Sequence, residues 1–88
     1  MPTFEEVWER IEAHAGEEFQ QVRGGRFSYQ VLGGSIKPNR TNWNIHQSQF
    51  RKALSLVPLE GPGQINDLQG PAYVYAILMD ERIRQGAW

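Results

Sequence analysis

Two pairs of adjacent glycines constrain the fold of this 88-residue chain more than any other feature. The pairs are Gly24-Gly25 and Gly33-Gly34. Two-residue Gly-Gly connections allow the positive φ angles of tight hairpin turns. Between the pairs, over residues 27–32, apolar and polar residues alternate, which is the pattern of a half-buried strand. We therefore predict a three-stranded antiparallel meander with strands at 19–23, 27–32 and 35–38. A fourth extended segment at 43–45 is also compatible with the sequence.

A helix is predicted before this meander. Thr3 is followed three residues later by Glu6, the spacing of a capping box, in which each side chain satisfies a backbone N–H at the start of a helix. Gly16 supplies a signal for the end of the helix. Between these signals, apolar residues recur at helical spacing. They are Phe4, Val7, Trp8, Ile11 and Ala15.

A second helix is predicted directly after the extended segment, and Pro58 ends it. His46 occupies its cap position with Gln49 three residues later, and Ile45 and Phe50 are spaced to form a hydrophobic staple. The apolar residues at helical spacing are Phe50, Ala53, Leu54 and Val57.

A third helix is predicted to open at Gly70-Pro71, because proline suits the first helical position. Its residues 72–79 are apolar on nearly every side, which indicates a central buried helix, and Gly86 can end it. The order α-β-β-β-α-α predicts one small α+β domain over residues 1–88. It has an N-terminal helix, a three-stranded antiparallel meander and two C-terminal helices.

Composition narrows the classes of function. The chain has no cysteine, which excludes disulfides, thiol nucleophiles and zinc sites built on thiolates. The N-terminal residues lack the pattern of a signal peptide, and the apolar run at 72–79 is too short to span a bilayer. We expect a soluble, cytoplasmic domain without membrane contact.

Charge is sorted along the chain. Residues 1–20 carry six glutamates and one arginine, and residues 53–88 carry four acids and two arginines. Residues 21–52 carry six basic residues and no acid. Such asymmetry is informative about partners, although not about the fold. The middle segment is therefore the candidate binding surface.

We predict that this segment binds nucleic acid, with DNA favoured. Arginine and lysine suit phosphates, and a helix N-terminus and amide side chains are common in such interfaces. The expected phosphate contacts are Arg23, Arg26, Lys37, Arg40, Arg51 and Lys52. The expected secondary contacts are Asn39, Asn42, Trp43 and Gln47, with Trp43 able to stack on an unpaired base.

Two other interpretations stay open. In the first, the domain is a protein-interaction or homo-oligomerisation module, in which the acidic first helix of one copy meets the basic meander of another. In the second, the basic meander packs beside Glu5, Glu9 and Glu12 of its own first helix and is neutralised within the fold. For Trp43 itself the alternative is a place in the core, where large aromatic residues are usually found.

Catalysis is not expected. His46, Ser48 and Asp67 could be combined into a triad, but no nucleophile-elbow sequence surrounds the serine. Neither His14 nor His46 has a second histidine three or four residues later, as helical metal sites require. We therefore expect no enzyme activity, no metal and no cofactor.

Overall fold

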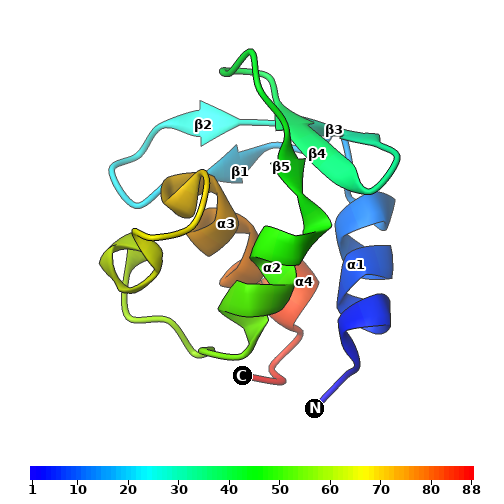
Figure 1. Cartoon of the computed structure of the whole chain (residues 1–88), viewed down its shortest axis with the longest axis vertical. Coiled ribbons are helices and arrows are strands. Elements are labelled where there is room, and N and C mark those ends of the chain that lie inside the picture. The colour runs from blue at the N-terminus through cyan, green and yellow to red at the C-terminus, as the bar shows by residue number, and fades with distance from the viewer.

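The computed structural model describes residues 1–88 and confirms the α+β class (Figure 1). One helix comes first, five short strands follow, and helices complete the domain. The helices are α1 (Phe4–Ala13), α2 (Gln47–Leu54), α3 (Pro71–Leu78) and α4 (Glu81–Arg84), and a 3₁₀ turn, η1, spans Pro62–Ile65. The strands are β1 (Phe19–Gln20), β2 (Arg26–Phe27), β3 (Tyr29–Leu32), β4 (Ser35–Pro38) and β5 (Ile45–His46).

Helix α1 begins where the sequence predicts. The Thr3 hydroxyl accepts a hydrogen bond from the backbone N–H of Glu6 at 3.2 Å. The Glu6 carboxylate contacts the Thr3 hydroxyl instead of the Thr3 backbone, so only half of the capping box is formed. After the helix, Gly16 has a φ of 87° and its N–H donates to the Tyr29 carbonyl at 2.9 Å. The end of α1 is thereby tied to β3.

The strands form two small antiparallel sheets, where the sequence predicted one. β1 and β2 pair with each other, and β3, β4 and β5 form the three-stranded meander. The predicted strand at 27–32 is interrupted at Ser28, because both backbone groups of Ser28 are bonded to Asn39 at the end of β4. The meander is therefore displaced by one strand along the chain. The segment near 43–45 supplies its third strand, and the segment at 19–23 belongs to the separate β1–β2 hairpin.

Both glycine pairs lie in hairpin turns, but only the second makes the predicted two-residue connection. Gln20 pairs with Arg26, so Gly24 and Gly25 end a longer loop over residues 21–25, and the predicted strand at 19–23 is shorter than expected. Gly24 has a φ of 90° and Gly33 a φ of 62°, a region of backbone space that side chains with a Cβ rarely occupy. The pairing of Leu32 with Ser35 leaves Gly33 and Gly34 as the two-residue turn between β3 and β4. Turn chemistry thus sets the register of β3 and β4.

Helix α2 is capped by the predicted residue. The His46 Nδ1 accepts a hydrogen bond from the backbone N–H of Ser48 at 3.1 Å. Gln49 does not complete a capping box, because its amide oxygen accepts from the backbone N–H of Gln69 at 2.9 Å. That bond fastens α2 to the loop that precedes α3.

The C-terminal helices differ from the prediction at one point. α3 begins at Pro71, as expected, after Gly70 in a left-handed conformation. It ends at Leu78 and does not continue toward Gly86, because Asp80 is extended and its carboxylate accepts from the backbone N–H of Arg82 at 2.9 Å. Asp80 thereby starts the separate helix α4.

One core serves both sheets and all the helices. Its nineteen buried apolar side chains come from every helix and strand, so no element has a core of its own. Val74, Ile77 and Leu78 of α3 are fully buried, which confirms α3 as the central helix. No helix in the structure has both the length and the apolar character needed to cross a membrane.

Candidate nucleic-acid interface

The structure divides the ten predicted contact residues between two surfaces. Three of them, Gln47, Arg51 and Lys52, belong to α2. The others lie on the β1–β2 hairpin, at the end of β4 and in the loop 39–44 that follows it. Figure 1 places α2 below the strands, whereas the loop between β4 and β5 projects at the top of the molecule. We name the second surface the basic end and define it as Arg23, Arg26, Lys37, Asn39, Arg40, Asn42 and Trp43.

Arg40 joins the two parts of the basic end. Its Nη1 donates a hydrogen bond to the Gln21 Oε1 at 3.2 Å. The guanidinium also lies directly against Gly25, where an added Cβ would come within 2.5 Å of the Arg40 Nη1. The loop 39–44 and the turn of the β1–β2 hairpin are therefore in contact, although they are far apart in the sequence.

The two hairpin arginines remain available to an external anion. Arg23 is exposed in the turn, and its side chain makes no hydrogen bond or ion pair within the chain. Arg26 lies 3.4 Å from the Glu18 Oε2, with side chains that are 67% and 63% exposed. Exposed pairs of this kind contribute about 0–1 kcal/mol, so a phosphate can displace Glu18 at little cost.

Lys37 adds a fourth cation on the outward face of the meander. Its Nζ donates to the Thr41 carbonyl at 2.9 Å and has no carboxylate partner, so ammonium protons remain free to donate. Beside it is a pocket of about 220 Å³. The pocket is lined by Ser28, Tyr29, Gln30, Lys37 and Asn39. The lining is mostly polar, which suits an anionic or strongly hydrogen-bonding group.

The α2 residues have other roles. The Arg51 Nη2 pairs with the Glu5 Oε2 at 3.2 Å, and its Cζ lies 4.3 Å from the centre of the Phe4 ring. The sequence left open whether basic residues are neutralised by the glutamates of α1. One such pair is formed, but by Arg51 of α2 and not by a residue of the meander. Gln47 donates its backbone N–H to Gly34, at the end of the meander opposite the loop 39–44. Lys52 is exposed on α2 without a partner.

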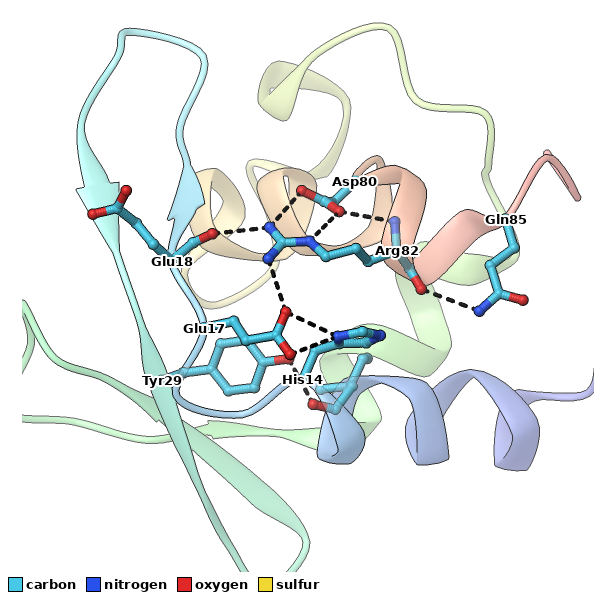
Figure 2. Close-up of polar contacts among 8 residues, drawn as sticks. His14, Glu17, Glu18, Tyr29, Asp80, Arg82 and Gln85 are labelled. Atoms are coloured by element: carbon cyan, nitrogen blue, oxygen red, sulfur yellow. Dashed lines mark hydrogen bonds and ion pairs between the residues drawn. The ribbon is translucent and has the colours of Figure 1, made fainter.

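Arg82 fixes the segment that leads into the β1–β2 hairpin (Figure 2). From the first turn of α4, its Nη1 donates to the Glu17 Oε1 at 3.1 Å and its Nη2 donates to the Glu18 carbonyl at 2.9 Å. Its Nε donates to the Asp80 Oδ1 at 2.8 Å. The guanidinium also stacks on the Phe19 ring. The base of the basic end is thereby anchored to the helical part of the domain.

These contacts change the acidity of two carboxyl groups. Hydrogen bonds from Arg82 hold the pKa of Asp80 below its usual value, against an opposing effect of burial. Contact with His14, at 3.0 Å, lowers the pKa of Glu17, and Arg82 adds to this effect. Both carboxylates therefore stay ionised at neutral pH and hold the Arg82 guanidinium in place.

The residues considered for catalysis form a helix cap. The His46 Nδ1 lies 3.0 Å from the Ser48 Oγ and accepts from the Ser48 N–H, whereas Asp67 contacts neither residue. The structure contains no group of three or more histidine or acidic side chains placed to hold a metal ion.

Three residues that the sequence reasoning missed help to build the basic end. Gln21 holds Arg40, Gly25 leaves room for it, and Tyr73 of α3 contacts the ring of Trp43. The paired glycines indicated a turn, but they gave no sign that a side chain would lie against it. Tyr73 was assigned to the core because it stands in the apolar run of α3.

Comparison of the chain with protein-family models, curated proteins and solved structures found no match. What the basic end can bind is therefore inferred from its own chemistry. It offers four cations, exposed amide side chains and one exposed indole ring.

Proposed function

We propose that this domain binds nucleic acid, with the phosphate backbone lying across the basic end. The observation that carries the proposal is the contact of Arg40 with Gln21, which unites the loop 39–44 with the β1–β2 hairpin. Without that contact, the arginines of the two segments would be separate surface charges. With it, the guanidinium of Arg40 lies against the hairpin that carries Arg23, and neither arginine has a carboxylate partner.

The chemistry of these side chains supports a phosphate ligand. Guanidinium groups present a planar set of donors that matches phosphate oxygens, and lysine contributes a compact point charge. Arg23, Arg26 and Arg40 would take successive phosphates, and Lys37 would reach a fourth beside its polar pocket. Asn39 and Asn42 would add hydrogen bonds to phosphate, sugar or base edges.

Salt dependence of binding tests the proposal. Four phosphate contacts predict a slope of log affinity against log salt of about −3.6 on duplex DNA and about −2.8 on a single strand. The measurement is fluorescence anisotropy with labelled oligonucleotides between low and physiological salt. If neither duplex nor single strand binds at low salt, the proposal is wrong.

A matched pair of double variants locates the interface. Arg23→Gln with Arg40→Gln should make the duplex slope less negative by about 1.8, because two phosphate contacts are lost. Arg51→Gln with Lys52→Gln removes the same charge from α2 and should leave the slope unchanged. Equal effects of the two variants would show that only net charge matters and that the basic end is not the interface.

Self-association is a second candidate, favoured by one feature of α1. Glu9 and Glu12 are exposed and make no ion pair within the chain, so the acidic face of α1 is free to meet the basic end of another copy. Such a head-to-tail contact would be screened by salt. Sedimentation velocity over a salt series decides it. A monomer at every salt concentration would exclude this function.

A further inference from the structure

Trp43 differs from the other tryptophans of the chain. Trp8 is buried in the core, with 8% of its surface exposed, and Trp88 donates its Nε1–H to the Leu78 carbonyl. Trp43 lies in the loop 39–44 with 41% of its surface exposed. The sequence left open whether this residue belongs to the core or to the surface, and the structure places much of the ring at the surface.

The Trp43 ring is nevertheless held in one position. It packs edge-to-face with Tyr73, with ring centres 6.2 Å apart and planes at 78°. Tyr73 in turn packs edge-to-face with Phe27 of β2, with ring centres 4.9 Å apart. The ring also lies close to Gly70, where an added Cβ would be 3.2 Å from the Trp43 Cζ3.

The loop backbone around the ring is fixed as well. The Thr41 hydroxyl lies within hydrogen-bond distance of two carbonyl oxygens, 3.3 Å from that of Pro38 and 2.9 Å from that of Trp43. An aromatic ring held in this way loses little conformational freedom when a ligand stacks on it. Trp43 therefore has the rigidity of a preformed platform.

The ring lies on the same loop as Arg40, and both are linked to the β1–β2 hairpin. Arg40, three residues before Trp43, reaches the β1–β2 hairpin through Gln21. Tyr73 connects Trp43 to the same hairpin through Phe27. An anionic chain that follows the arginines would thus pass beside an exposed indole ring.

We propose that Trp43 is a stacking platform for an unpaired base and that the domain therefore prefers single-stranded nucleic acid to duplex. This inference rests on the proposed function and specifies its ligand. The bases of a duplex are already stacked on one another and cannot lie on the ring, whereas those of a single strand are free to do so. Stacking on one aromatic side chain changes the affinity for a single strand by about tenfold or more and depends little on base identity.

The test compares two forms of one DNA. A labelled twelve-residue oligothymidine and its duplex with oligoadenosine are titrated with the full chain at several salt concentrations. The wild type should bind the single strand at least about tenfold more tightly than the duplex. Trp43→Ala should lose about tenfold or more on the single strand and little on the duplex, and Trp43→Phe should retain most of the affinity.

Salt and a control variant separate stacking from charge. In Trp43→Ala the salt slope should stay the same while affinity falls at every salt concentration, because the phosphate contacts remain. Leu32→Ala removes another exposed apolar side chain, 46% exposed at the turn between β3 and β4, and should bind as the wild type does. Thermal unfolding establishes that each variant is folded. If Trp43→Ala is not, Trp43→Leu takes its place, because leucine keeps an apolar side chain but cannot stack on a base, and it should lose the same single-strand affinity.

The outcomes distinguish the two proposals. Salt-dependent binding that is equal for duplex and single strand, or that is unchanged in Trp43→Ala, overturns the stacking role and leaves the phosphate interface in place. Loss of binding on substitution of Arg51 and Lys52, but not of Arg23 and Arg40, overturns both.

Discussion

The Cζ atom of Arg82 lies 3.9 Å from the centre of the Phe19 ring, so the first turn of α4 covers the first residue of β1. The same guanidinium donates to the Glu18 carbonyl and pairs with Glu17 and Asp80. A cation above an aromatic ring is attracted to its face, and bonds to carboxylates add to that attraction. The β1–β2 hairpin, which carries part of the basic end, is therefore supported by a residue near the C-terminus.

Removal of this support should destabilise the domain. We expect Arg82→Met to lower the free energy of unfolding by about 2 kcal/mol, because several charge-assisted hydrogen bonds and the stacking on Phe19 are lost together. Urea unfolding followed by circular dichroism measures the change. Arg23→Met is the control, since Arg23 is exposed and unpaired, and it should change stability by less than about 0.5 kcal/mol. Equal stability of the two variants would contradict the role given to Arg82.

The same contacts predict acid sensitivity. Hydrogen bonds from Arg82 lower the pKa of Asp80 in the folded state, whereas the unfolded carboxyl has a pKa of about 3.9. As the pH falls, the unfolded state binds the proton first. The stabilisation is therefore complete above about pH 5 and is lost as the pH falls through 4 toward the folded pKa.

The measurement is the free energy of unfolding between about pH 6 and pH 3. Asp80→Asn should show a shallower decline than the wild type over this interval, while asparagine still caps α4. Asp67→Asn, at an exposed carboxylate without a partner, should decline as the wild type does. If the free energy of unfolding of Asp80→Asn falls with pH as steeply as that of the wild type, the ionisation of Asp80 does not contribute to stability.

Local signals in the sequence predicted the positions of the helices well. Thr3 before α1, His46 before α2 and Gly70-Pro71 before α3 each act within one helical turn, so neighbouring residues suffice to reveal them. The break at Ser28 was not predictable in this way, because it depends on bonds to Asn39, eleven residues later. The end of α3 at Leu78 was not predicted, because the third helix was expected to continue toward Gly86, although the spacing of Asp80 to Arg82 suits a new cap.

A buried hydroxyl gives a third prediction. The Tyr29 hydroxyl donates to the Ile11 carbonyl at 2.6 Å in the last turn of α1 (Figure 2), and burial raises the pKa of Tyr29. Tyr29→Phe should cost about 1–2 kcal/mol of stability, because the buried carbonyl loses its partner. Tyr75→Phe is the control, since Tyr75 is also packed against the core but its hydroxyl has no bond like that of Tyr29 to Ile11. If both variants are equally stable, the bond to Ile11 contributes nothing.

The raised pKa of Tyr29 also affects how the stability of the domain changes at alkaline pH. The unfolded tyrosine ionises near pH 10, whereas the folded one resists ionisation, so the unfolded state loses its proton first as the pH rises. The wild type should therefore lose stability above about pH 10. Tyr29→Phe should lose less over the same range when the unfolding free energy is measured by urea titration at each pH.

The candidate site was only partly predictable, for a related reason. The acid-free segment predicted one group of six cations, but the structure divides them between the basic end and α2, because their distribution over the surface depends on how the hairpins fold. Arg40 reaches Gln21 only because the β1–β2 hairpin stands apart from the meander as its own sheet. Arg51 turns away to Glu5 because α2 packs against α1. The positions of Arg40 and Arg51 in the sequence do not show that the first contacts the hairpin and the second pairs with α1.

Gly25 tests the contact that unites the basic end. An alanine there would place its Cβ 2.5 Å from the Arg40 Nη1, and the flexible arginine would move away at little cost to the fold. We expect Gly25→Ala to keep nearly the stability of the wild type and to bind DNA several-fold more weakly, because Arg40 no longer shares a surface with the hairpin. Anisotropy titration at low salt measures the affinity, and thermal unfolding measures the stability.

Gly63→Ala is the matched control for this substitution. Gly63 lies in η1 and is not one of the residues that contact Arg40, and an added Cβ there meets no atom within 4 Å. Its affinity for DNA should equal that of the wild type. If Gly25→Ala also binds as the wild type does, the position of Arg40 against the hairpin is not needed for binding. The phosphate backbone would then follow the loop 39–44 alone, with the hairpin arginines outside the interface.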